Sequence, residues 1–141
     1  MIWKNNPTVN GLNAVNDNTI CSTLGIEFTD VGEDYLIAKM PVDSRTKQPM
    51  GLLHGGASVV LAETLGSVAS VISHEDVSKQ SIVGIEVNAN HLKSAKSGFV
   101  YGKVTPIKVG RKLHIWEITI TNEANEKVCV SRLTVMVLPK S

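Results

Sequence analysis

Apolar residues follow two different periods along this chain. From Gly56 to Ser73 they recur every three or four residues without a proline, which predicts a helix. At 1.5 Å per residue this helix would be about 26 Å long. From Ile82 to Asn90 apolar and other residues alternate, as in a strand. One face of that strand is expected to carry Val83, Ile85, Val87 and Ala89, and the other Gly84, Glu86, Asn88 and Asn90.

Further segments rich in β-branched residues predict more strands. These are residues 35–40, which stop at Pro41, and residues 99–104, 113–121 and 128–138. Pro106 and Gly110 mark the gap after residues 99–104, and Asn122 to Glu126 form an expected hairpin loop. A short helix is expected up to Val15. One central helix followed by a run of antiparallel strands is an α+β pattern, in which the sheet curls around the helix.

Composition narrows the class of protein. The chain has 141 residues, 43% of them hydrophobic, which predicts a single domain over residues 1–141 with a real core. The net charge of +1 argues against a general nucleic-acid binder. No apolar run approaches a membrane span, since even the run before Glu63 extends only over 57–62. Cys21 and Cys129 have no motif spacing, so we expect packed, reduced thiols in a cytoplasmic protein.

Glu63 is the one fully charged side chain between Gln48 and His74. It shares helical spacing with Ser67, Ser70 and His74, so these residues could form an ordinary solvent-facing stripe. Such a stripe usually carries several charges, however, and here small uncharged residues surround the carboxylate. A carboxylate that faces an enclosed cleft is a frequent general base or nucleophile.

His54, Gly55 and Gly56 lie at the start of the predicted helix. The two glycines could simply form the turn into the helix. The first N–H groups of a helix, however, have no intrahelical partner, and glycine allows a carbonyl to approach them closely. This combination is typical of an oxyanion site for acyl transfer. The amide of Gln48 is either a plain loop residue or a further donor to the same carbonyl.

Other chemistries find little support. The His-Gly-Gly segment lacks the Gly-x-Ser-x-Gly elbow that lipase-like hydrolases need. The four histidines show no metal-ligand spacing, and there is no phosphate loop, so neither a metal nor an organic cofactor is expected.

The block from Gln48 to Gly56, followed by Glu63 and Ser67, resembles the hot-dog-fold acyl-CoA thioesterases. The similarity extends over nearly the whole chain, including residues 1–4, 40–46, 87–91 and 131–134. It implies that Glu63 is the nucleophile or the general base, with Ser67 and Thr64 beside it. It also implies that Gly55 donates its N–H to the thioester oxygen, while Gln48 and His54 polarise that carbonyl. The implied CoA-binding residues are Gly84, His91, Leu92, Lys93, Ser94, Lys108, Val109, Gly110, Arg111 and Lys112.

The resemblance also implies a substrate and an assembly. The substrate would be an aromatic acyl-CoA, specifically 1,4-dihydroxy-2-naphthoyl-CoA of menaquinone biosynthesis, with misloaded aryl carrier protein as an alternative. A non-catalytic acyl-CoA binding module on the same fold is a competing class, although a binder does not need Glu63. Homodimers that pair into homotetramers are expected. Gly55 and Glu63 are about 12 Å apart along one helix, so either the helix begins well after Gly55 or the site combines two subunits.

Overall fold

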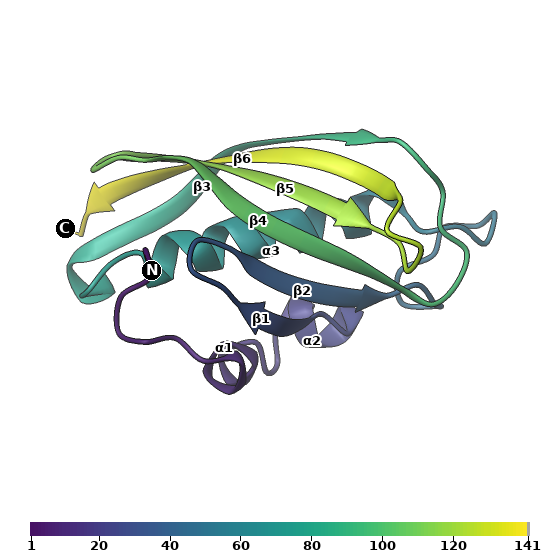
Figure 1. Cartoon of the computed structure of the whole chain (residues 1–141), viewed down its shortest axis with the longest axis horizontal. Helices are drawn as coiled ribbons and strands as arrows, with labels where there is room; N and C mark the ends of the chain where they lie inside the picture. The colour runs from purple at the N-terminus through teal and green to yellow at the C-terminus, as the bar shows by residue number, and fades with distance from the viewer. Residues whose placement is uncertain (141) are drawn as a thin grey trace.

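The computed structural model describes residues 1–140 and contains one sheet and one long helix (Figure 1). The helical elements are α1 (Val9–Val15), α2 (Ile20–Leu24), α3 (Gly55–Ile72) and the 3₁₀ turn η1 (Val77–Lys79). The strands are β1 (Glu27–Val31), β2 (Leu36–Pro41), β3 (Gln80–His91), β4 (Phe99–Val109), β5 (Leu113–Thr121) and β6 (Lys127–Pro139).

The six strands form an antiparallel sheet in the order β1-β2-β4-β5-β6-β3. Figure 1 shows the sheet curved over α3, which lies along one of its faces. The long strand β3 forms one edge of the sheet, although it precedes the three strands that complete the sheet. It pairs with β6 along its whole length, from Gln80 opposite Pro139 to His91 opposite Cys129. Its other edge has no strand beside it within residues 1–140.

Small and aliphatic residues let α3 lie close to the sheet. Its buried face is made of Ala57, Ser58, Leu61, Ala62, Leu65, Gly66, Ala69 and Ser70. Gly66 is needed there, because a Cβ at this position would lie 2.5 Å from Cδ2 of Leu133 on β6. The opposite face carries Val59, Glu63 and Ser67, which are only half-buried because no element of the same chain covers them fully.

Both ends of α3 are closed by other segments. His54 is the N-cap, and its Nδ1 accepts a hydrogen bond of 2.8 Å from the N–H of Gly56. At the other end, the N–H of Lys4 donates to the carbonyl of Ile72 at 2.7 Å. The N-terminal segment therefore satisfies part of the end of the helix.

Most predicted elements are confirmed, and three details differ. Pro106 lies inside β4, because a register shift between Pro106 and Lys108 accommodates the missing N–H. A second register shift, between Gly84 and Glu86, changes which residues of β3 face the helix. Plain alternation places Gly84 and Val87 on opposite faces, but in the structure both face α3. Val83 and Ile85 are exposed instead. The elements α2 and β1 were not predicted.

By length and composition alone, α3 could cross a membrane, which corrects the expectation that no segment approaches that length. It has 18 residues and a mean hydropathy of 1.5. The same values are usual for the central helix of a globular core, and 44% of its residues are buried in the fold.

Candidate active site

Three hydrogen-bond donors, each with an N–H that has no partner among residues 1–140, lie at or just before the start of α3. The N–H of Gly55 has no partner among the described residues, whereas the next N–H donates to His54. Because Nδ1 of His54 accepts that bond, the neutral ring carries its proton on Nε2, which can donate elsewhere. The side-chain oxygen of Gln48 accepts from the N–H of Met50, and this leaves its NH₂ group as a donor. These groups can stabilise an oxyanion.

A pocket of about 340 Å³ opens beside these donors. It brings Gln48 and Gly55 together with the predicted CoA-binding segment from His91 to Ser94. His91 lies directly against Gly55, because a Cβ at Gly55 would be 2.8 Å from Nε2 of His91. The other residues around this pocket are Leu52, Leu53, Ser58 and Val128.

Glu63 lies two turns further along α3, on its open face. Its Oε2 lies against Gly84 of β3, where a Cβ would be only 2.8 Å away. Glycine therefore leaves the space that the carboxylate occupies. Glu63 takes part in none of the ion pairs among the described residues, which join Met1 to Glu33, Arg45 to Asp43, and Lys93 to Glu126. A half-buried carboxylate without a cation is free to act on a ligand.

The neighbours of Glu63 on the helix differ in their contacts. The hydroxyl of Thr64 lies 3.4 Å from the thiol of Cys21 on α2, so Thr64 ties the two helices together. Ser67 is half-buried one turn beyond Glu63 and lies on the same open face. Of the two, Ser67 is better placed to contact a ligand beside Glu63.

Gly55 and Glu63 are too far apart to act on the same atom within one chain. Because α3 begins at Gly55, the helix does not start later than expected. Eight residues at 1.5 Å each separate them by about 12 Å along the helix axis. A nucleophile and an oxyanion donor must both come within about 3 Å of the reacting centre.

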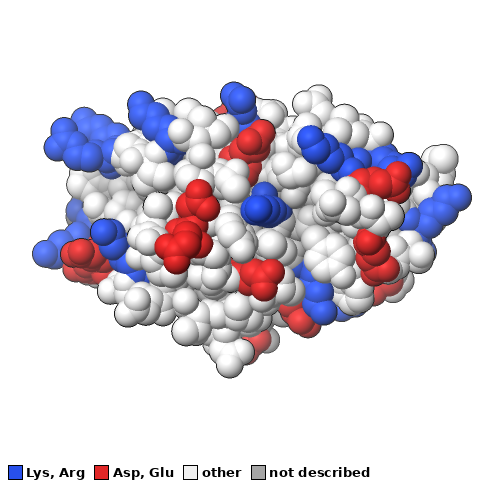
Figure 2. All heavy atoms as spheres, in the orientation of Figure 1, with Lys and Arg blue, Asp and Glu red and all other residues white. Residues whose placement is uncertain are grey.

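The basic segment from Lys108 to Lys112 lies at the opposite end of the sheet from His91. The carbonyl of Lys112 accepts from the N–H of Val137 on β6. Val137 pairs with Ile82 near the start of β3, whereas His91 lies at the end of that strand. Figure 2 shows the basic side chains of this end gathered at the upper left. Lys93 is less available than expected, because it pairs with Glu126 at 3.4 Å. That lysine helps to lower the pKa of Glu126, after the side chain of Asn122.

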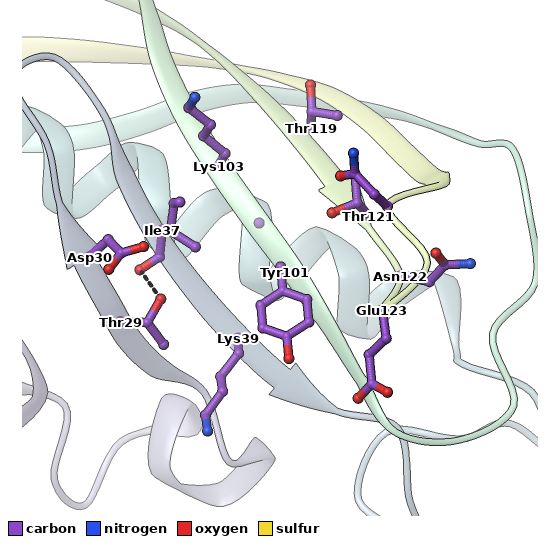
Figure 3. Close-up of a pocket in the computed structure, with 12 residues that line it drawn as sticks. Thr29, Asp30, Ile37, Lys39, Tyr101, Lys103, Thr119, Thr121, Asn122 and Glu123 are labelled. Atoms are coloured by element: carbon purple, nitrogen blue, oxygen red, sulfur yellow. Dashed lines mark hydrogen bonds between the residues drawn. The ribbon is translucent and has the colours of Figure 1, made fainter.

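Two pockets of about 500 Å³ or more lie outside the Gln48–Glu63 region. One, of about 500 Å³, contains Arg111 and Lys112 together with Lys79, a cation that the sequence did not single out. The other, of about 640 Å³, lies on the outer face of the sheet around Tyr101 (Figure 3). Lys39, Lys103, Asp30 and Glu123 give it charges of both signs, and it contains no predicted site residue.

Comparison with known proteins decides the family. The model of the thioesterase superfamily matches residues 50–129, more than half of the chain. The chain belongs to the thioesterase superfamily. The matched residues include Gly55, Glu63 and the strand with Gly84, whereas Gln48 lies just before them.

Similar thioesterases extend over nearly the whole chain. It is 49% identical over 138 residues to the 1,4-dihydroxy-2-naphthoyl-CoA hydrolase of Escherichia coli K12, covering 98% of this chain and 100% of that protein. It is 47% identical to the proofreading thioesterase EntH of Cronobacter turicensis, covering 98% and 99%. The crystal structure of a Haemophilus influenzae thioesterase has a TM-score of 0.94 at 47% identity, covering 99% of this chain and 96% of that chain. The hot-dog fold and the thioesterase class are thereby confirmed.

Some groups of this thioesterase site had no local signal in the sequence. Ser58, Leu52 and Val128 line the pocket beside Gly55, but each reads as an ordinary core or loop residue. The contact between Gly84 and Glu63 depends on the shift in β3, which reverses the faces that plain alternation predicts. Only the fold brings these residues together.

Proposed function

We propose that this thioesterase hydrolyses an aromatic acyl-CoA, with 1,4-dihydroxy-2-naphthoyl-CoA as its substrate. The proposal rests on one observation above all. Gln48 and Gly55 line one pocket, with His54 next to Gly55 in the chain, while the only carboxylate of the helix faces a glycine on its open side. The 49% identity to a hydrolase of that substrate supports the acyl group.

The reaction adds water to the thioester and releases the acid and the CoA thiol. Donors at Gly55, Gln48 and His54 would stabilise the negative charge that develops on the carbonyl oxygen. Glu63 would either take a proton from the attacking water or attack the carbonyl itself and form an anhydride. In a single turnover in ¹⁸O-labelled water, label in the Glu63 carboxylate would demonstrate the anhydride route, because general-base hydrolysis places the label only in the released acid.

The active site would combine two subunits related by a two-fold axis. The free edge of β3, with Val83 41% and Ile85 50% exposed, offers a strand to a second copy. The half-buried open face of α3 would pack against the partner helix. Gln48, His54 and Gly55 of one chain would then face Glu63 and Ser67 of the other, giving two sites per dimer. Dimers would pair further into tetramers.

CoA would contact both ends of the sheet in such an assembly. Its pantetheine arm would pass Gly84 and the segment from His91 to Ser94. Its phosphates would bind the cations of residues 108–112, with Lys79 beside them. We favour CoA thioesters over aryl carrier protein as substrates, because the phosphates of CoA suit the cations of residues 108–112. The identity to EntH, 47%, is almost as high as the identity to the CoA hydrolase, 49%.

Glu63→Gln tests the chemistry. It keeps the shape but removes the charge, so kcat for 1,4-dihydroxy-2-naphthoyl-CoA should fall about a hundredfold or more in a folded protein. A panel of aryl-CoA, fatty acyl-CoA and aryl-carrier-protein thioesters, compared by kcat/KM, tests the substrate. Near-normal turnover by the Gln variant would contradict the role of Glu63. A higher kcat/KM on carrier protein would contradict the substrate.

Subunit mixing tests the shared site. Glu63→Ala and the double variant Gln48→Ala/His54→Ala, each inactive alone, are unfolded together and refolded. A mixed dimer has one site with both defects and one with none, so about half of the activity per dimer should return. If tagged chains assemble together without activity, all these groups act within one chain.

A further inference from the structure

A buried polar cluster lies beneath the C-terminal half of α3, within a largely apolar core. It consists of Ser70 on the helix and His114 and Trp116 on β5, with exposed fractions of 0%, 1% and 0%. Nε1 of Trp116 donates to Oγ of Ser70 at 2.7 Å, and Nδ1 of His114 lies 2.9 Å from the same oxygen. Burial of three polar groups is costly unless they are hydrogen-bonded to one another.

The directions of these hydrogen bonds follow from their chemistry. An indole N–H can only donate, so the Ser70 oxygen accepts from Trp116. The Ser70 proton then points to Nδ1 of His114, its acceptor among the described contacts. His114 is therefore neutral, with its proton on Nε2. Burial lowers the pKa of His114 and keeps it neutral, and nearby His74, whose ring stacks at 5.3 Å, lowers it further.

His114 continues the chain to an exposed loop. It is the second residue of β5 and pairs with Val109, the last residue of β4, so it flanks the connection that Gly110 begins. The next two residues are the cations Arg111 and Lys112. A hydrogen bond within the loop also stabilises it, because the N–H of Gly110 donates to the carbonyl of Leu113 at 2.9 Å. The cluster thus joins the helix that carries Glu63 to the loop that carries the cations.

Gly84 and His114 lie at the same level of the sheet, one on each side of β6. Gly84, against which Glu63 lies, pairs with Val135 on β6, and Val135 pairs with His114 on β5. Two strand spacings of about 4.8 Å place His114 about 10 Å from Gly84. Movement of His114 would therefore move the Gly110–Lys112 loop relative to Gly84, against which the Glu63 carboxylate lies.

We propose that Ser70 and His114 are positioning residues, which hold the Gly110–Lys112 loop in place so that it binds the phosphates of the CoA thioester. This inference rests on the proposed function, in which that loop binds CoA. Neither residue touches the substrate. They act through the backbone of the loop, and so they affect binding of the nucleotide rather than bond cleavage.

The proposal predicts an effect confined to one kinetic constant. His114→Leu removes the hydrogen bond to Ser70, so KM for the CoA thioester should rise about tenfold while kcat stays within about twofold. The thioester of N-acetylcysteamine lacks the phosphates and should be unaffected. His114→Gln is the matched control, because its amide can still accept from Ser70. Its KM should stay near that of the wild type.

Arg111→Gln separates this inference from the function on which it rests. If Arg111→Gln leaves KM for the CoA thioester unchanged, the loop does not bind phosphate and that part of the proposed function fails. If Arg111→Gln raises KM but His114→Leu does not, the function stands and the positioning role is wrong. If both raise KM, the double variant should be no worse than about the stronger single variant, because both act through the same loop. Equal loss on both thioesters by His114→Leu would show a merely structural role.

Two measurements keep the test decisive if His114→Leu does not fold. Ser70→Ala is a smaller change and should raise KM for the CoA thioester in the same selective way. In the wild type, ¹⁵N-histidine NMR can resolve His114 among the four histidines. A proton on Nε2 between pH 6 and 8 supports the hydrogen-bond chain. A proton on Nδ1, or a charged ring, would overturn it.

Discussion

Gly84→Ala should slow the enzyme and stabilise the protein at the same time. The new methyl group would lie 2.8 Å from Oε2 of Glu63, whereas ordinary contact begins at 3.4 Å. The carboxylate must therefore move by about 0.6 Å. Since a misplacement of about 1 Å can cost a hundredfold in rate, we expect kcat to fall about tenfold.

The gain in stability has a separate cause. The backbone of Gly84 is outside the left-handed region, so alanine can adopt it without strain. Alanine has fewer conformations than glycine in the unfolded chain, and the free energy of unfolding should rise by about 0.4–1 kcal/mol. Thermal or urea unfolding, together with kcat for an aryl-CoA, measures both effects.

Gly66→Ala is the matched control, because Gly66 lies on the buried face of α3, opposite the face that carries Glu63. Its methyl group would lie 2.5 Å from Cδ2 and 3.2 Å from Cβ of Leu133, inside the packed layer. Overpacking should lower stability by about 1–3 kcal/mol, with much smaller loss of kcat per folded molecule. If Gly84→Ala turned over at the wild-type rate while Glu63→Gln were inactive, the Glu63 carboxylate would not lie against Gly84 during the reaction.

Two further predictions concern stability alone. The side chain of Asn13 accepts from the N–H of Phe28 at 2.7 Å and donates to its carbonyl at 3.0 Å, so Asn13→Ala should cost about 1–3 kcal/mol in urea unfolding. A loss below about 0.5 kcal/mol would show that water replaces both bonds. The lowered pKa of His114 means that the unfolded chain binds a proton more readily than the folded one below its ordinary value of 6.5. The contribution of His114 to the free energy of unfolding should therefore be complete above that pH and decrease as the pH falls below it. His114→Gln should remove this part of the dependence of stability on pH.

The sequence predicted the long elements well because their periods are strong. The helix expected from Gly56 to Ser73 runs from Gly55 to Ile72, and the strand expected over residues 113–121 has those bounds. The strand 99–104 was too short, because the proline at position 106 reads as a terminator. The chain instead places it at a register shift, where no ladder N–H is needed.

The candidate site was predictable where its chemistry lies in one segment. Glu63 stood out because it is charged among small and apolar residues, and Gly55 because it begins a helix. The seat of Glu63 on Gly84 could not be predicted, since a one-residue shift in β3 decides which side chains face the helix. Nor does any local pattern show that Lys93 is paired with Glu126, which lies on a different connection.

The position of β3 at the sheet edge sets the order of events during synthesis. Gly84 acquires its strand partner, Val135, only after about fifty more residues, which at roughly 5–20 residues per second takes several seconds. Until then the apolar helix α3, which precedes β3 in the chain, lacks the sheet that will cover it. Chaperones can bind the helix during this time. A ribosome-bound chain that stops before residue 135 would carry Gln48, His54 and Glu63 but lack the pairing that fixes the seat of the carboxylate. Catalytic competence is therefore acquired late, when the last strand joins.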